Sequence, residues 1–304
     1  MKTIMITGAS GFVGRRLSRN FLEKGCRVIG LGTSPRHPFS HQYKAFEWIQ
    51  ADTTREGEWQ DRVAEADIIV NLAGRTIFKK WTRKYKQAIY DSRIETTKNI
   101  VTAMEPGNTQ KLLSTSAAGF YGDGGDEILT EDGLSGSDFL ARLSRAWENE
   151  AEKAADKGTI VSIMRFGVIL GKEGGALSVM APAFRFFVGG PLGSGMQWFP
   201  WIHIQDIEGG VTFLAETRDA EGVFNFTAPE PVRQKTFARA LGRSLNRPAV
   251  MPAPSFMVKT VMGELGSSLL QSQRVVPERL QNAGYRFLFK ELDAALADLF
   301  KAAG

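Results

Sequence analysis

The sequence predicts an α/β fold, built on a doubly wound parallel sheet and completed by a smaller C-terminal α+β lobe. Over the first half of the chain, short apolar runs alternate with segments of helical periodicity. This alternation is typical of parallel strands joined by crossover helices. After residue 171, glycines and prolines cluster in GKEGGA, VGGPLGSG and AVMPAPS, and the regular alternation ends. We therefore expect a large sheet domain and a second, less regular unit.

The order of the elements follows from their periodicity. Strands are expected at residues 3–7, 27–31, 46–50, 67–72, 111–116 and 159–170, and helices at 12–24, 81–104 and 139–157. Gly25 and Gly158 mark helix ends, since glycine commonly follows the last helical residue. Residues 171–200 are expected to be largely irregular, and residues 204–215 to return to the sheet domain. The predicted division is residues 1–170 with about 201–228 for the sheet domain, and 171–200 with 229–304 for the lobe.

Composition limits the kind of protein this is. The chain has 304 residues, 43% of them hydrophobic and 23% charged. A single cysteine, Cys26, excludes an internal disulfide framework, and three histidines make a Cys/His metal cluster unexpected. No apolar run approaches the roughly 20 residues that span a membrane. The opening MKTIMITGAS runs directly into a strand, so we expect no signal peptide and a cytoplasmic protein.

Basic residues are concentrated in one segment. Residues 75–98 hold eight basic and two acidic side chains, a net charge of +6, whereas the whole chain carries +5. A nucleic-acid-binding protein usually presents a basic face over a larger surface, so no nucleic-acid partner is expected. Two interpretations remain open, a solvated helix face and a surface that favours anionic ligands. The basic residues are Arg75, Lys79, Lys80, Arg83, Lys84, Lys86, Arg93 and Lys98.

A glycine-rich turn separates the first expected strand from the first helix. In the segment TGASGFVG, Gly8 permits a tight turn, Gly11 lets backbone approach a pyrophosphate, and Gly14 lets the helix pack closely on the strand. The helix N-terminus offers free N–H groups and a positive dipole to phosphates. The spacing G-x-x-G-x-x-G departs from the commoner G-x-G-x-x-G, and a turn without ligand is the alternative. We predict a Rossmann-type dinucleotide site whose turn contributes Thr7, Gly8, Ser10, Gly11, Phe12, Val13 and Gly14.

The residues after the second strand indicate which dinucleotide is bound. NAD-binding proteins usually offer a carboxylate there to the ribose hydroxyls. This chain has Gly32-Thr33-Ser34-Pro35-Arg36 instead. Thr33 and Ser34 can donate hydrogen bonds to a 2′-phosphate, and Arg36 can pair with it. The sequence therefore favours NADP(H), with NAD(H) as the alternative.

Further candidates for the cofactor crevice follow other strands or lie on the long helices. Asp52, beside Thr53, is placed to reach an adenine amino group, and the segment Asn71-Leu72-Ala73-Gly74 should run beside the pyrophosphate and ribose. Each segment alone could instead be an ordinary turn, since Asn, Asp and Gly favour turns. The remaining candidates for cofactor contact are Leu72, Ala73, Gly74, Arg93, Ser114 and Trp147.

These motifs resemble a known family. The segments TGASGFVG, NLAG, STSAAGFYG and RFGVILG are similar to extended short-chain dehydrogenase/reductases of the nucleotide-sugar epimerase/dehydratase type. The segments SRIETTKNI, WIHIQDI, FNFTAPEPV, GRSLNRPAVMPAPSF and RVVPERLQNAGYRF resemble an atypical branch, the SDR39U1-like epimerase-family proteins with a C-terminal DUF1731 segment. The resemblance covers essentially the whole chain.

The resemblance implies a catalytic Ser–Tyr–Lys trio, and two of its members are missing. Ser116 matches the serine, which orients the substrate oxygen. The tyrosine and lysine of the Tyr-x-x-x-Lys pair fall near Leu143 and Trp147. Leucine cannot transfer a proton, and tryptophan cannot supply the charge that lowers a phenol's pKa. Trp147 is expected either in the core or as a flat surface against ribose or substrate.

Other residues are candidates for the missing proton transfer. Tyr121 could act as a catalytic acid, although its position in the family usually contacts cofactor or substrate. His203 could be an acid or base, since its unperturbed pKa is near neutrality, or a hydrogen-bonded core residue. Arg165 is a candidate for a buried ion pair.

Two functions are consistent with these features. The first is an NADP(H)-dependent oxidoreductase or epimerase acting on a small carbonyl or hydroxyl compound that could be anionic. The second is an NADP(H)-binding sensor or regulatory protein without turnover, which the missing Tyr–Lys pair favours. The resemblance also implies that helices 81–104 and 139–157 pair in a four-helix interface, giving a homodimer.

Overall fold

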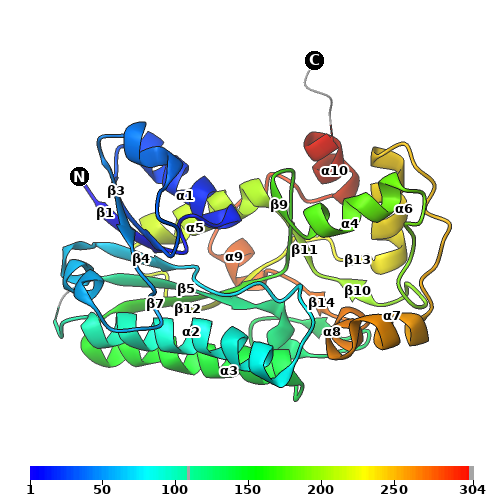
Figure 1. Cartoon of the computed structure of the whole chain (residues 1–304), viewed down its shortest axis with the longest axis horizontal. Helices are drawn as coiled ribbons and strands as arrows, with labels where there is room; N and C mark the ends of the chain where they lie inside the picture. The colour runs from blue at the N-terminus through cyan, green and yellow to red at the C-terminus, as the bar shows by residue number, and fades with distance from the viewer. Residues whose placement is uncertain (108–109, 301–304) are drawn as a thin grey trace.

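A computed structural model describes residues 1–107 and 110–300. Seven parallel strands form the central sheet in the order β12-β7-β5-β4-β1-β2-β3 (Figure 1). Because the strand order reverses between β1 and β4, their carboxyl ends border the crevice where doubly wound sheets bind ligands. The predicted Rossmann-type α/β fold is confirmed. The strands are β1 (Thr3–Thr7), β2 (Arg27–Gly32), β3 (Phe46–Gln50), β4 (Ile68–Asn71), β5 (Lys111–Ala117), β7 (Ile160–Phe166) and β12 (Gly222–Phe226).

Helices cover both faces of this sheet (Figure 1). On one face lie α1 (Phe12–Glu23) and α5 (Ile204–Glu216), and on the other α2 (Arg83–Ala103) and α3 (Phe139–Glu152). The buried side of α1 includes Leu17 and Phe21, one turn apart, which pack in an apolar cluster that also contains residues of α5 and β12. A 3-10 turn, η4 (Lys153–Lys157), continues α3 until Gly158 at φ +83°. No helix within the described ranges is long and apolar enough to cross a bilayer.

The sixth expected strand, residues 159–170, is in fact two strands. β7 ends at Phe166, and β8 (Val168–Gly171) leaves the central sheet to pair with β11 (Trp201–His203) and β9 (Gly174–Gly175). The break falls at Gly167, where a Cβ would lie 2.4 Å from the Pro200 carbonyl oxygen. The expectation of a single strand was wrong because both halves are apolar and periodicity alone shows no interruption.

The structure also corrects the expectation that residues 171–200 are largely irregular. Residues Ala176–Arg185 form α4, whose buried side carries Leu177, Ala181 and Phe184 at helical spacing. The glycines on both sides of this short helix obscured its pattern. Leu177 and Phe184 pack in another apolar cluster with residues of α6 (Gln234–Ser244) and α10 (Leu292–Phe300).

The remaining elements are short. The other helices are α7 (Ser255–Met262), α8 (Glu264–Leu269) and α9 (Glu278–Asn282), with 3-10 turns η1 (Pro38–His41), η2 (Glu58–Glu65) and η3 (Ala118–Tyr121). The other strands are β6 (Ile128–Leu129), β10 (Trp198–Phe199), β13 (Val232–Arg233) and β14 (Arg274–Val275). The last residues of the predicted lobe, 301–304, lie outside the described residues.

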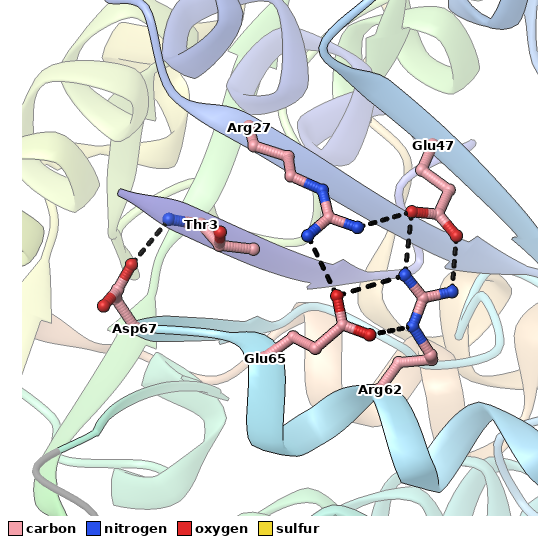
Figure 2. Close-up of polar contacts among 6 residues, drawn as sticks. All are labelled: Thr3, Arg27, Glu47, Arg62, Glu65 and Asp67. Carbon is pink, nitrogen blue, oxygen red and sulfur yellow. Dashed lines mark hydrogen bonds and ion pairs between the residues drawn. The ribbon is translucent and has the colours of Figure 1, made fainter. Parts of the chain in front are cut away.

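A network of charges fastens η2 to the edge of the sheet. Arg27 at the start of β2 and Arg62 of η2 share the carboxylates of Glu47 and Glu65 (Figure 2). Arg27 Nη2 lies 2.8 Å from Glu47 Oε2, and its Nη1 lies 2.9 Å from Glu65 Oε2. Hydrogen bonds from Arg62 lower the pKa of both carboxyls. Since each side chain is roughly a third exposed, the network contributes modestly to stability, and it lies at the end of β2 opposite the crevice.

Candidate cofactor and substrate site

The glycine-rich turn has the geometry of a phosphate site. Gly8 has φ +67°, and a Cβ on Gly14 would lie 2.3 Å from the Gly8 carbonyl oxygen. Gly11 occupies the N-cap of α1 without a side-chain hydrogen bond, and the first turn of α1 contains no acidic residue. The first N–H groups of α1 therefore face the crevice with a positive dipole and no carboxylate to compete for them. A pyrophosphate fits this cradle.

A buried hydrogen-bond network fixes the floor of the crevice. Thr7 Oγ1 donates to Asn71 Oδ1 at 2.7 Å and accepts the N–H groups of Leu72 and Ala73, each at 3.2 Å. Asn71 Nδ2 donates to Thr97 Oγ1 at 2.8 Å, as does Trp147 Nε1, also at 2.8 Å. Thr7 thus acts on the crevice through loop 72–74, and Trp147 is oriented by α2. Ser114 joins the same network through Asn71 Nδ2, at 3.5 Å.

The segment after β2 lies beside the turn. A Cβ on Gly32 would lie 3.1 Å from Ser10 Oγ, so the chain here must approach the turn closely. The Ser34 carbonyl accepts the indole N–H of Trp48 at 3.2 Å, and Arg36 is exposed. Arg15, on the first turn of α1, is also exposed, whereas Arg16 is held by Glu208 at 2.8 Å. Two cations therefore remain available near the end of β2.

The two residues predicted to contact the adenine, Asp52 and Thr53, already form hydrogen bonds within the protein. Asp52 Oδ1 accepts the backbone N–H and the hydroxyl of Thr54 at 3.2 and 2.7 Å, which is a turn in its own right. Thr53 is buried, and its hydroxyl hydrogen-bonds Thr96 of α2 at 2.9 Å. Thr53 consequently holds the loop against α2, and the exposed Asp52 keeps Oδ2 for a ligand.

A cavity of about 380 Å³ opens beside the crevice. Its walls combine the carboxyl ends of β4 and β5, the side of α3 and part of α8. Among the contacts that hold the C-terminal segment over it, Lys86 Nζ bonds Glu264 at 2.8 Å, and Gln271 Nε2 bonds Asp138 at 2.9 Å. Of the predicted site residues, the cavity brings together Phe12, Leu72, Gly74, Arg93, Ser116 and Trp147.

Leu143 and Trp147 face this cavity alongside Ser116. The two positions where the resemblance implies the tyrosine and the lysine therefore lie beside Ser116. Among the lining residues that the structure describes, Arg93 is the sole ionisable side chain. The described residues of the cavity wall consequently include no tyrosine, histidine or carboxyl group that could exchange a proton near neutral pH.

Ser116 is held by a residue that the sequence reasoning missed. Its Oγ donates to Glu148 Oε1 at 2.5 Å, and Glu148 forms a two-point ion pair with Arg165 at 2.9 and 2.8 Å. Both charged side chains are buried, which confirms the expected role of Arg165. Because a carboxylate accepts and cannot donate, the Ser116 proton points toward Glu148. The lone pairs of Ser116 are left to accept a hydrogen bond from a hydroxyl in the cavity.

Tyr121 belongs to the same buried network, away from the cavity wall. Its hydroxyl donates to Asn225 Oδ1 at 2.7 Å and accepts from Arg165 Nη1 at 2.9 Å. Burial raises the pKa of Tyr121 to about 12, although Arg165 opposes the shift. The phenol is thus satisfied on both sides within the fold, and it supports the Glu148–Arg165 pair.

His203 lies at a different place from Ser116. It caps α5, with Nδ1 accepting the Gln205 N–H at 3.2 Å, and Nε2 lies 3.4 Å from Asp298 of α10. Burial lowers the pKa of His203 to about 4, so the imidazole is neutral at neutral pH. It borders a separate, smaller cavity of about 170 Å³ together with Arg16 and Lys172. In residues 1–107 and 110–300, no cluster of three or more metal-ligating side chains is found.

Glu148 could have been found by one signal in the sequence. It is a carboxylate inside the amphipathic pattern of α3, directly after Trp147, where an apolar or small residue is usual. The lobe residues that complete the cavity, such as Leu265 and Leu269 of α8, carry no such signal because their approach depends on the packing of distant segments.

Comparison with known proteins agrees with this architecture. Residues 4–226 match the NAD dependent epimerase/dehydratase family, and residues 253–299 match DUF1731, a domain of unknown function. The chain is 37% identical to an epimerase family protein, the chloroplastic SDR39U1 homolog of Arabidopsis thaliana, over 97% of this chain and 85% of the relative. It is 36% identical to the epimerase family protein SERP0438 of Staphylococcus epidermidis, over 99% of this chain and 100% of that protein.

A solved structure gives the same result. The fold is similar to that of human epimerase family protein SDR39U1 (isoform 2), solved with NADPH, with a TM-score of 0.85 and 30% sequence identity. The match covers 98% of this chain and 99% of the human one. The glycine turn, the strand order and the full-length matches together identify this chain as a member of the NAD dependent epimerase/dehydratase family with a C-terminal DUF1731 segment.

Proposed function

We propose that this protein binds NADP(H) in the crevice above β1 and β4 and acts as an epimerase-type oxidoreductase on a small molecule in the adjoining cavity. The observation that carries the proposal is the α1 turn, where Gly8 and Gly14 let the turn pack closely on Leu72 and Ala73 and on the start of α1, and Gly11 leaves the helix N-terminus without a side-chain cap. The human relative solved with NADPH supports the same choice of cofactor. When bound, the nicotinamide supplies or accepts a hydride.

Residues of this chain position the substrate in the cavity. Ser116 accepts a hydrogen bond from a substrate hydroxyl, because its own proton is directed at Glu148. Trp147, fixed by Thr97, forms a flat wall of the cavity. The C-terminal lobe closes the cavity through α8, which limits the access of water to the reacting atoms.

The preference for the 2′-phosphate is tested through Arg36. We expect Arg36→Ala to weaken NADPH binding about 10- to 100-fold, the effect of losing a hydrogen bond to a charged group, and to leave NADH binding unchanged. The affinities are measured by the fluorescence of the reduced nicotinamide. Lys44→Ala is the control, since Lys44 is an exposed cation next to β3 and its loss changes the net charge equally. Tighter binding of NADH than NADPH by the unaltered protein would overturn the cofactor assignment.

A second function, an NADP(H)-dependent sensor without turnover, is favoured by one observation. The described cavity wall has no side chain that replaces the proton-donating tyrosine. A sensor would bind a partner with different affinity in the presence of NADPH and NADP⁺, and would neither reduce a carbonyl compound nor oxidise a hydroxyl compound. Measurable hydride exchange between bound cofactor and any such compound excludes this alternative.

A further inference from the structure

The cavity beside the crevice is lined mainly by apolar and aromatic side chains. Phe12, Trp147 and Phe199 contribute aromatic rings, and leucines of α3 and α8 close the remaining sides. At about 380 Å³, it is near the lower end of the usual range for ligand pockets, about 300–1,000 Å³. A small ligand with an apolar body therefore matches the cavity in both size and chemistry.

Arg93 is the one charged group among the described residues of this wall. Its Nη1 donates to backbone carbonyls, those of Arg75 at 3.1 Å and Ile89 at 3.2 Å. Gly74 permits its approach, because a Cβ there would lie 3.0 Å from Arg93 Cζ. The guanidinium also lies over Trp147, 5.2 Å from the ring centroid. These contacts hold the group in place without neutralising it.

The charge of Arg93 lacks a counterion within the described part of the chain. No carboxylate of those residues lies within 4.0 Å of it, whereas Arg16, Arg27, Arg62 and Arg165 each have at least one. Burial lowers the pKa of Arg93 to about 10, so the side chain remains charged at neutral pH. A partly buried cation without a partner is unfavourable, and an anionic ligand group would reduce that cost.

The polar groups around the cavity do not suit a nucleotide sugar. Such a ligand brings two phosphates and many hydroxyls, which require several cations and free hydrogen-bond donors. In each of three lining glutamines, one of the two amide N–H groups already donates within the fold. Gln197 donates to the Leu192 carbonyl at 3.0 Å, Gln271 to Asp138 at 2.9 Å and Gln273 to the Gly122 carbonyl at 3.0 Å.

We propose that the substrate is a small monocarboxylate with an aromatic or other apolar body and a hydroxyl or carbonyl group for the reaction, with its carboxylate on Arg93 and its apolar body against Trp147 and Phe199. This inference rests on the proposed function, since it describes the substrate of the same site. A planar guanidinium binds a carboxylate through two parallel hydrogen bonds, which fixes the orientation of the ligand as well as its affinity.

The test compares three probes on the NADP⁺-loaded protein by isothermal titration calorimetry. They are trans-cinnamate, its neutral analogue cinnamamide, and UDP-glucose. We expect cinnamate to bind about 10- to 100-fold more tightly than cinnamamide, the effect of a charged hydrogen-bonded pair. In Arg93→Met this preference should vanish, and in Arg93→Lys it should be partly retained. Arg145→Met is the matched control, because Arg145 is an exposed cation on α3 that does not line the cavity.

Several results would overturn the inference. Equal binding of cinnamate and cinnamamide, no binding of cinnamate, or tighter binding of UDP-glucose would each do so. If Arg93→Met weakened the two cinnamyl probes equally, Arg93 would have a structural role alone. A titration of NADP⁺ into the unaltered protein and every variant distinguishes failure of the proposed function from failure of the proposed substrate class. If NADP⁺ does not bind the unaltered protein, the proposed function is contradicted. If NADP⁺ binds but the protein does not prefer the carboxylate, the substrate class alone is contradicted.

Discussion

At the scale of single residues, the direction of one proton determines what Ser116 can do. Glu148 accepts a hydrogen bond from the Ser116 hydroxyl, and Arg165 holds Glu148 through two hydrogen bonds. The serine is thereby an acceptor toward the cavity, suited to a hydroxyl group. This arrangement also explains why Tyr121 is unsuited to donate a proton to a substrate: its hydroxyl and its neighbours stabilise the ion pair behind Ser116.

The substitution Ser116→Ala tests this arrangement without a substrate. Removing the hydroxyl leaves a buried carboxylate oxygen with one partner fewer, so the free energy of unfolding should fall by about 1–3 kcal/mol. Urea denaturation followed by circular dichroism measures the change. Thr115→Ala, one position along β5, is the comparison, because the Thr115 hydroxyl has no hydrogen-bond partner among residues 1–107 and 110–300. A loss below about 0.5 kcal/mol for Ser116→Ala would indicate that the hydroxyl is directed into the cavity instead.

Some of these roles could be predicted from residue types and some could not. Gly8, Gly11 and Gly14 indicated the turn because their spacing reflects a local backbone requirement. The positions of Leu143 and Trp147 followed from their distance along one helix. The link from Ser116 to Glu148 joins β5 to α3 across 32 residues, and no local pattern encodes which acid meets which hydroxyl.

At the scale of elements, α3 contributes one wall of the cavity. Contacts at the first turn of α3 fix the position of this helix. Asp138 is the N-cap: its Oδ1 accepts the N–H groups of Leu140 and Ala141 at 2.7 and 3.1 Å. Its Oδ2 accepts from Gln271 of the C-terminal lobe. One carboxylate therefore caps the helix and ties the lobe to it.

We expect Asp138→Ala to lower the free energy of unfolding by about 0.5–2 kcal/mol, the usual effect of removing a helix cap. Asp138→Asn should lose less, because an amide oxygen can still cap the helix. Thermal unfolding of the two variants and the unaltered protein measures the difference. If both variants were as stable as the unaltered protein, the cap would contribute nothing to the position of α3.

The elements that sequence analysis misjudged share a physical cause. β7 and β8 form one apolar run, and only the close approach of Pro200 to Gly167 separates them. The helix α4 is short and flanked by glycines, and its stability comes from packing on α6 and β8 rather than from local propensity. Tertiary contacts determine both the break between β7 and β8 and the formation of α4. The long helices α1, α2 and α3, by contrast, could be predicted from their periodicity.

At the scale of the whole molecule, His203 and Asp298 connect the sheet domain to the last helix. His203 caps α5, and Asp298 of α10 lies 3.4 Å from its Nε2. Burial holds the pKa of His203 near 4, with Asp298 raising it and Arg16 lowering it. The pairing of two copies through α2 and α3 stays a prediction, which sedimentation can test against the 33.5 kDa mass of one chain.

The pKa of His203 predicts how stability responds to acid. The unfolded histidine takes up a proton near pH 6.5, whereas the folded one resists it until about pH 4. Because the unfolded state binds more protons in this window, stability should fall by ~2 kcal/mol between pH 7 and 4.5 on account of this residue. His203→Asn keeps a capping side chain and cannot titrate, so its stability should fall less over the same range. If urea unfolding showed the same loss of stability with falling pH for both proteins, His203 would not be the group responsible.

The central claim is that the crevice above β1 and β4 holds NADP(H) with the nicotinamide directed toward the cavity. A crystal structure of the protein with NADP⁺ measures this most directly. We predict the diphosphate at the N–H groups that begin α1, the 2′-phosphate beside Arg36 and the nicotinamide near Ser116 and Trp147. A diphosphate bound elsewhere, or a nicotinamide outside the cavity lined by these residues, would contradict the account.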